Sequence, residues 1–444
     1  FSNDIGITNT RVKLITVTLD DGATTATGVL SDFNGHVYAD TINITAAGVD
    51  DVASATFAQD VGFTTMALDK DTGQATVTFD GTTGTQTVSG NIKGGSSTND
   101  EGLVIFSNDV DYTGMIGTSA STGIGDVRVA LNKTLTLTSA ADIDGIYTAG
   151  NLDVDSAGGI GGTVTLVGAT STSTTSATAG TTQISLIDGT TTLTALNING
   201  GTGKTSTAAG TVGAAGGTST GTFTGAAAIT TLTLAGGTAG VGVANNATDT
   251  DGGAGGAVTG TFTAALTATT VGVTGAAGGA GGAGGASAAA TGSEGGAGGA
   301  STLDLNVATG TAQAITTLTI TAGAGGDAGA TNTNIGAAGG VGGDALATVA
   351  GDLSGSVVLD DGSAGTSVDA GGAGGAGSTA TGTFDGETVQ TISSIITAAA
   401  DGEGTIIITG DEGSADLKTF SGAIGTNAIR IGTITSGVSA ALSN

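Results

Sequence analysis

A glycine-rich run from Gly275 to Ala300, GAAGGAGGAGGASAAATGSEGGAGGA, is the feature that most restricts how this chain can fold. Its middle part, residues 278–286, repeats Gly-Gly-Ala with a strict period of three. The sequence contains no proline, which excludes a collagen triple helix. Shorter copies of the run recur at 252–257, 295–300, 339–343 and 371–376. The fold must therefore accommodate the same small segment several times.

Two interpretations of these runs stay open from the sequence. Glycine-rich chains behave as flexible coils, so the runs could be linkers. Alternatively, they form extended helices with three residues per turn, in which Ala280, Ala283 and Ala286 share one edge and glycines take the other two. Ordering glycine costs roughly 0.5–1 kcal/mol per residue relative to alanine, so such helices need neighbours to pack against. A phosphate-binding loop is not expected, because Gly201–Thr205 is only a fragment of that motif.

The segments between the runs have the composition of β-strands and repeat along the chain. Aligned strands begin at Leu196, Leu232, Val271, Leu318, Val357 and Ile406, with separations of 36, 39, 47, 39 and 49 residues. One such unit cannot bury its few apolar side chains, whereas stacked units can. We therefore predict an all-β fold in which residues 151–404 form a β-solenoid or stacked β-array, with glycine-rich arms of three-residue period on one side.

The two ends of the chain have a more ordinary composition. Residues 1–150 contain six of the nine basic residues and six of the ten phenylalanines, and strands are expected at 11–19 and 75–79. We predict a β-sandwich-like domain there. Residues 405–444 regain Lys418, Phe420 and Arg430, which suggests a C-terminal cap or assembly segment.

The charge and composition exclude several classes of protein. The net charge of −29 argues against binding to nucleic acid or anionic membranes, which requires a basic surface. No positive residue lies between Lys204 and Lys418, so the acids there are solvated or neutralised by cations. No apolar run reaches the roughly 18 residues of a membrane-spanning helix. We expect an extracellular protein, and the N-terminal Phe1 suggests a processed product or a fragment.

Catalysis has little support in the sequence. The single histidine, His36, begins an alternating strand and is expected to be a solvated residue. Without a second histidine or a nucleophile elbow, a hydrolase triad is not indicated. No Cys or His cluster suits zinc. Carboxylates are frequent enough that a paired-carboxylate glycosidase stays open, although the repeats have few of the aromatic residues that line such clefts. We predict that the protein is not an enzyme.

Calcium is the cofactor that the sequence favours, because hard cations take carboxylate and carbonyl oxygens that glycine-rich turns can bring together. The candidate ligands lie in Asp- and Gly-rich segments: Asp69, Asp71, Asp249, Asp251, Asp344, Asp360 and Asp361. The segment 339–347, GGVGGDALA, matches the calcium-binding nonapeptide GGxGxDxUx at every position. An Asp that caps a turn is an equally good explanation of the other positions.

The nonapeptide and the Gly-, Thr-, Ala- and Asp-rich composition of residues 151–444, without cysteine, resemble those of bacterial RTX-like and β-strand-repeat surface proteins, including S-layer proteins. The resemblance implies a secreted, calcium-binding structural protein. We therefore expect a self-assembling subunit of an S-layer or extracellular filament, which associates through β-edges and Gly-rich faces. Its expected partners are further copies of itself and cell-surface glycans.

Threonine alternates with leucine or isoleucine in several strands, including 134–138, 231–233 and 317–321. Flat threonine arrays on solenoids resemble those of ice-binding proteins. Alternation of inward leucine and outward threonine is equally typical of any half-buried strand. The alternative function is accordingly a calcium-dependent adhesin or an ice-binding module.

Overall fold

The computed structural model describes most of the chain. The described residues are 1–19, 28–47, 51–70, 73–82, 84–95, 101–117, 124–130, 133–138, 143–148, 152–153, 163–167, 181–186, 191–205, 212–242, 251–282, 293–307, 312–329, 337–367, 378–385, 390–392, 395–398, 404–409, 418–426 and 429–436. Every helix or strand assigned within them is a β-strand. The predicted all-β class is therefore confirmed. None of the described residues belongs to a helix that could cross a membrane.

The chain forms two compact units. Unit 1 comprises Phe1–Val167, Gln183–Asn197 and Phe223–Ile229, and unit 2 comprises Gly168–Thr182, Ile198–Thr222 and Thr230–Asn444. The strands of the first half are β1 (Val12–Leu19), β2 (Gly28–Phe33), β3 (Val37–Ala46), β4 (Val52–Phe57), β5 (Val61–Lys70), β6 (Gln74–Phe79), β7 (Gln86–Gly94), β8 (Glu101–Phe106), β9 (Val110–Thr113), β10 (Ile124–Val129), β11 (Thr134–Thr138), β12 (Ile143–Thr148), β13 (Leu152–Asp153), β14 (Thr163–Val167) and β15 (Thr181–Leu186).

The remaining strands follow in chain order. They are β16 (Thr191–Asn199), β17 (Ser219–Phe223), β18 (Ala227–Ala235), β19 (Val258–Phe262), β20 (Leu266–Thr274), β21 (Ser301–Leu305), β22 (Ala312–Thr321), β23 (Ala345–Val349), β24 (Asp352–Asp360), β25 (Ala380–Asp385), β26 (Gln390–Ile392), β27 (Ile395–Ala398), β28 (Thr405–Thr409), β29 (Lys418–Phe420) and β30 (Thr433–Ser436). The predicted domain boundaries near residues 150 and 404 stay predictions.

Unit 1 is a parallel β-solenoid. Most of its strands pair with the strand two positions later in the chain, so that β3 lies beside β5 and β4 lies beside β6, in parallel register. The rings of Phe33, Phe57, Phe79 and Phe106 stack from coil to coil, with centroids 4.9, 5.9 and 5.4 Å apart. The sandwich-like prediction for residues 1–150 is thus wrong in its connectivity. Two facing sheets are present, but each successive coil adds its strands to the same parallel ladders, because the aromatic core repeats once in each coil.

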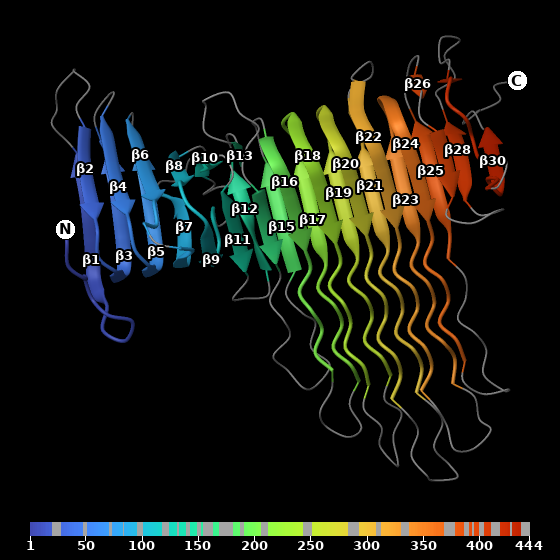
Figure 1. Ribbon diagram of the computed structural model, residues 1–444, viewed down its shortest axis with the longest axis horizontal. Coiled ribbons are helices and arrows are strands. Elements are labelled where there is room, and N and C mark those ends of the chain that lie inside the picture. The colour runs from blue at the N-terminus through green and yellow to red at the C-terminus, as the bar shows by residue number, and fades with distance from the viewer. Residues whose placement is uncertain are drawn as a thin grey trace, which may run out of the picture. The chain divides into compact units, whose positions relative to one another are not determined.

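Unit 2 has the same type of architecture, with glycine-rich arms between its coils. A short strand leads through a turn into a long strand, as in β19 and β20, and then the chain leaves the sheet before returning to the next short strand. Pairing is parallel throughout the described strands, from β19 with β21 to β28 with β30. The solenoid prediction is confirmed, and the arms all extend from the same side of the strands (Figure 1).

The glycine-rich arms are ordered in their described parts and follow the predicted three-residue period. We call the parts that follow long strands the outgoing segments (200–205, 236–242, 275–282, 322–329 and 361–367) and those that precede short strands the returning segments (212–218, 251–257, 293–300, 337–344 and 378–379). Gly275 donates to Thr321 at the end of β22 and Gly278 donates to Ala324 of the next outgoing segment, whereas Gly279 donates to Gly253 of a returning segment. Ala283 and Ala286 lie outside the described residues.

The period of three separates an inner from an outer edge in each arm. A Cβ added to Gly299 would overlap the carbonyl oxygen of Gly256, and one added to Gly256 would overlap that of Gly217. A side chain is therefore excluded at Gly256 and Gly299, where two segments meet. Side chains occupy the third edge, where Ala254 and Ala277 are exposed. The repeated Gly-Gly-Ala pattern thus results from two packed edges and one free edge.

The long strands contain a corner that breaks their alternation. In β20, Thr269 and Thr270 are both exposed between buried Ala268 and Val271. Two successive outward residues require a local bend, because alternate residues of a flat strand face opposite sides. The register also shifts between Ala314 and Thr317 of β22, at the same place in the next coil.

Candidate functional surfaces

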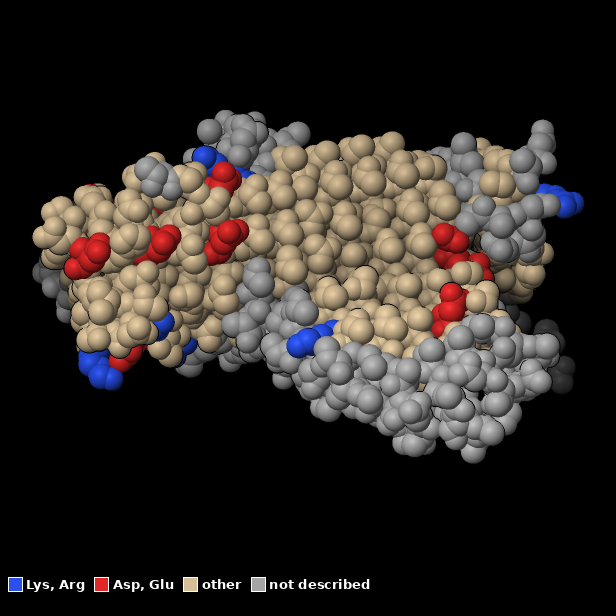
Figure 2. Space-filling view, turned by 60° about the horizontal axis from the view of Figure 1, so that its bottom comes forward, with Lys and Arg blue, Asp and Glu red and all other residues tan. Residues whose placement is uncertain are grey.

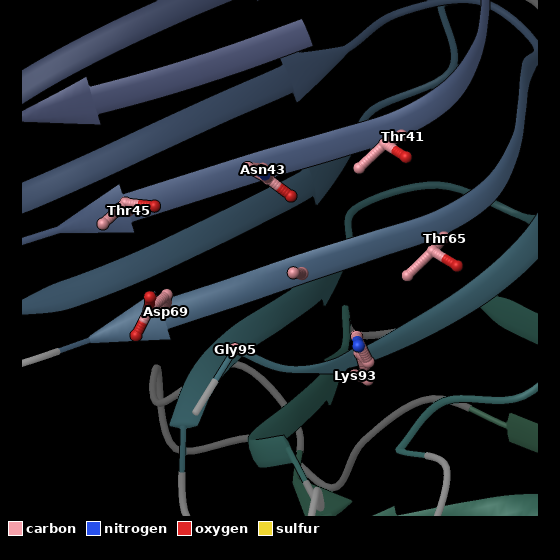
Figure 3. Close-up of a pocket in the computed structure, with 8 residues that line it drawn as sticks. Thr41, Asn43, Thr45, Thr65, Asp69, Lys93 and Gly95 are labelled. Atoms are coloured by element: carbon pink, nitrogen blue, oxygen red, sulfur yellow. The ribbon is translucent and has the colours of Figure 1, made fainter. Parts of the chain in front are cut away.

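A polar groove lies on the outer side of three neighbouring strands of unit 1, β3, β5 and β7 (Figure 3). It has a volume of about 440 Å³ and is lined by Thr41, Asn43, Thr45, Thr65, Ala67, Asp69, Lys93 and Gly95. The sheet register produces this set: Thr41 lies beside Thr65, Asn43 beside Ala67, and Ala67 beside Lys93.

The groove is open because Gly95 has no side chain and Ala67 has only a methyl group. A Cβ on Gly95 would overlap the side chain of Asp69. The lining offers hydroxyl, amide, carboxylate and ammonium groups, which together can donate and accept hydrogen bonds. The groove can therefore form hydrogen bonds with a polar ligand.

Two columns of threonine cross the short strands of unit 2. In the first column, Thr259 lies beside Thr302, and Thr381 beside Thr405. In the second column, Thr348 lies beside Thr383. Nine of the twelve outward positions from β19 to β30 are threonine, and the others are Asp304, Leu346 and Ile407. The earlier strand β17 pairs with β19 and adds Thr220 and Thr222.

Asp304 is the one acid in these columns. Burial raises the pKa of its carboxyl group above the ordinary range, and its Oδ1 atom is buried without a hydrogen-bond partner. Its neighbours across the ladder are Thr261 and Thr348. Figure 2 shows one face of the molecule, on which a broad area has neither acidic nor basic side chains.

The acids predicted as calcium ligands are spread over the fold. Asp71 and Asp249 lie outside the described residues, and Asp69 lines the groove. Asp251 Oδ1 accepts a hydrogen bond from the Glu294 amide at 2.9 Å. Within the described part of the chain, no three His, Cys, Asp or Glu residues gather closely enough to hold a metal ion. The calcium prediction stays a prediction.

The other predicted ligands have local structural surroundings. Asp344 Oδ1 accepts hydrogen bonds from the Thr379 amide at 2.9 Å and from its hydroxyl at 3.0 Å. Asp360 ends β24 beside Asp361. Burial and then the charge of Asp361 raise the pKa of Asp360.

The sequence reasoning missed a repeated cap that joins successive coils. Asp327 Oδ1 accepts hydrogen bonds from the amide and hydroxyl of Thr366, which lower the pKa of that aspartate. Asp352 similarly accepts from the Thr391 amide at 2.7 Å. In unit 1, Asp109 accepts from the Thr134 amide at 2.8 Å. The sequence signal that could have predicted this cap is an Asp followed, one coil later, by a Thr.

His36 has no catalytic surroundings in the described structure. Its Nδ1 atom lies 3.9 Å from Asp60 Oδ2, too far for a hydrogen bond, and its backbone amide donates to Asp4. Its side chain is 42% exposed, in keeping with the partly solvated residue expected from the sequence.

The outer coils expose large apolar side chains. Leu14 on β1 and Leu30 on β2 are 53% and 64% exposed, and Phe1 and Ile7 lie on the same end of unit 1. On β30 of unit 2, Ile434 is 53% exposed. The strands β1 and β2 lie at the edge of their ladders, since the described pairings give β1 only β3 and β2 only β4, and the N-terminal amine donates a hydrogen bond to the Asp32 carbonyl of β2.

Comparison with known proteins gives no relative. No protein-family model, curated protein or solved structure matches the chain.

Proposed function

We propose that this chain is a structural protein of the cell exterior that assembles with further copies of itself, as the subunit of an S-layer or an extracellular filament. The observation that carries the proposal is the exposed apolar edge of the outer coils. An edge strand with free backbone groups is a template for another strand. Leu14, Leu30 and Ile434 add apolar surface that such pairing would bury.

The two edges also differ in their residues, which favours an open assembly. Contact between the β1–β2 edge and the β30 edge of another copy would be heterologous. Heterologous contacts produce filaments when the rotation between subunits does not close a ring. The proposed role is non-catalytic, and the hydrogen-bonding groove of unit 1 is compatible with a glycan partner.

Light scattering and electron microscopy of the full chain test this proposal. We expect particle size to grow with protein concentration and elongated or sheet-like assemblies to form. Leu30→Lys and Ile434→Lys place a charge on the two edges and should reduce assembly strongly. Leu346→Lys is the matched control, because Leu346 is 39% exposed but lies on β23, away from the edges.

The proposal fails if the wild-type chain stays a monodisperse monomer at all concentrations. It also fails if Leu346→Lys reduces assembly as much as the two edge variants do. Circular dichroism of each variant verifies that the parallel sheets have formed.

A further inference from the structure

We propose that the threonine face of unit 2 binds ice. This face is the outer side of the short strands β17, β19, β21, β23, β25, β28 and β30. Its outward positions form the two columns that begin with Thr220 and Thr222. The proposal is independent of self-assembly, since it uses the face of the sheet rather than its edges.

The columns form a two-dimensional grid with fixed spacings. Neighbouring strands lie about 4.7–4.9 Å apart, and residues two apart along a strand are separated by about 6.4–6.8 Å. Register is maintained from coil to coil: Thr261 lies beside Asp304, which lies beside Thr348 and then Thr383. A crystalline ligand presents atoms with a fixed repeat in two directions, so it can contact every coil at once.

The side chains of the grid suit water as the ligand. Each threonine hydroxyl can donate one hydrogen bond and accept two, as a water molecule in ice also donates and accepts. Each threonine methyl group lies beside the hydroxyl and orders the first shell of water around it. The face therefore presents hydroxyl groups that can replace water molecules of the ice lattice, and methyl groups that lattice water can surround.

The grid is rigid before any ligand binds. Threonine is β-branched and has restricted rotation about χ1. Beneath it, Phe262, Leu303 and Leu305 are fully buried. The arms also join adjacent coils, because Gly255 donates to Ala297 and Gly298 donates to Val341 of the next returning segments. Little conformational entropy is then lost when the face meets a solid surface.

The charge distribution favours a neutral ligand. The whole chain has a net charge of −29, yet Asp304 is the one charged residue at the twelve paired outward positions. A carboxylate holds its own hydration shell, which competes with lattice water, and burial disfavours the charged form of Asp304. A crystalline polysaccharide is the less suitable ligand, because the described face offers it no aromatic ring for stacking.

Retention in growing ice tests the proposal on the full chain. A dilute solution is frozen slowly onto a cold surface, and the protein in the ice fraction is compared with a non-binding protein of similar size. We expect wild-type protein to be enriched in the ice and to inhibit ice recrystallisation. Thr261→Lys should reduce the retained fraction to the level of the non-binding protein. Asp304→Thr should increase it, because this change replaces the one acid of the second column with threonine.

Thr270→Lys is the matched control, since Thr270 is exposed on the long strand of the same coil. It should retain wild-type ice binding, and thermal unfolding should show that both lysine variants are folded. Exclusion of the wild type from ice would overturn the proposal, as would equal losses in Thr261→Lys and Thr270→Lys. Retention on microcrystalline cellulose without retention in ice would also overturn it and would identify a polysaccharide ligand.

Discussion

Single glycines determine whether the arms can pack. Gly299 donates to the Ala276 carbonyl and its own carbonyl accepts from Gly323, both at 2.8 Å. These bonds require a close approach of backbones, which a side chain at this edge would prevent. Ala297 lies two residues earlier, and its carbonyl accepts from Gly255. The position within the three-residue period therefore matters more than the small difference between glycine and alanine.

Gly299→Ala is predicted to destabilise unit 2 by roughly 1–3 kcal/mol, the usual effect of inserting atoms into a packed interior. Urea denaturation measures the change. Ala297→Ser at the outer edge is the control and should change stability by less than about 0.5 kcal/mol. If both substitutions have the same effect, the packing assigned to the arms is wrong.

Two aspartates should respond to pH in opposite directions. Burial raises the pKa of Asp304, so its ionisation destabilises the folded state above that pKa. Asp304→Asn should therefore stabilise the protein at pH 7, and the gain should vanish below about pH 3.9, the pKa of an unfolded Asp.

The hydrogen bonds from Thr366 lower the pKa of Asp327, so the carboxylate stabilises the fold above the unfolded pKa, and this contribution is lost as pH falls through the folded pKa. Asp327→Asn should accordingly destabilise at pH 7 and have a smaller effect in acid. Melting temperatures of both variants between pH 3 and 7 give the comparison. If both substitutions raise the melting temperature at pH 7, or both lower it, these assignments are contradicted.

At the scale of the element, the outward doublet of a long strand such as β20 determines how the strand fits its coil. In β20, Thr269 and Thr270 separate the buried residues on either side of the corner. The buried residues beyond it, Val271 and Val273, are inaccessible to solvent. A change of one residue at this point shifts every later side chain of the strand to the opposite face.

Deletion of Thr270 is therefore predicted to disrupt the coil, whereas Thr270→Ser should leave it intact. The deletion removes the bend or turns Val271 and Val273 toward solvent, and either result loses core packing. Limited proteolysis and circular dichroism would detect the local unfolding. A deletion variant as resistant to protease as the serine variant would show that the corner is not required.

At the scale of the whole molecule, negative charge opposes the compact state. The net charge is −29, and no positive residue lies between Lys204 and Lys418. Repulsion among solvated carboxylates is screened by salt, with a Debye length of about 30 Å at 0.01 M and about 8 Å at 0.15 M. Stability should therefore depend on ionic conditions more than in a protein of balanced charge.

Calorimetry in sodium chloride should show a melting temperature that rises between 0.01 and 0.15 M salt, the range over which the Debye length shortens most. Calcium chloride at matched ionic strength separates screening from specific binding. A larger rise in calcium that is reversed by a chelator would support the predicted calcium sites. Equal rises in the two salts would contradict them.

Much of the architecture could be predicted from particular residues. Alternation in Thr317–Thr321 indicated a half-buried strand, and that segment lies in β22. The Gly-Gly-Ala period left both flexible linkers and extended helices of three residues per turn open, and the described arms are ordered with hydrogen bonds that repeat every three residues. The connectivity of residues 1–150 was not predicted, because the pattern of Ala75–Phe79 is the same in an antiparallel and a parallel sheet. Only the spacing of Phe33, Phe57 and Phe79, which recur once in each coil, indicated how many residues a coil has.

The sequence by itself determined the β-class, the three-residue period and the excess of acid, because these depend on local side-chain chemistry and on counts. Only the tertiary structure decided which residues share a surface. Thr261 and Thr348 belong to one column although 87 positions separate them, and Asp69 and Lys93 line one groove. Coil lengths differ along the chain, so the spacing in sequence does not give the register. Pairing between strands sets that register, through backbone hydrogen bonds and the shared core.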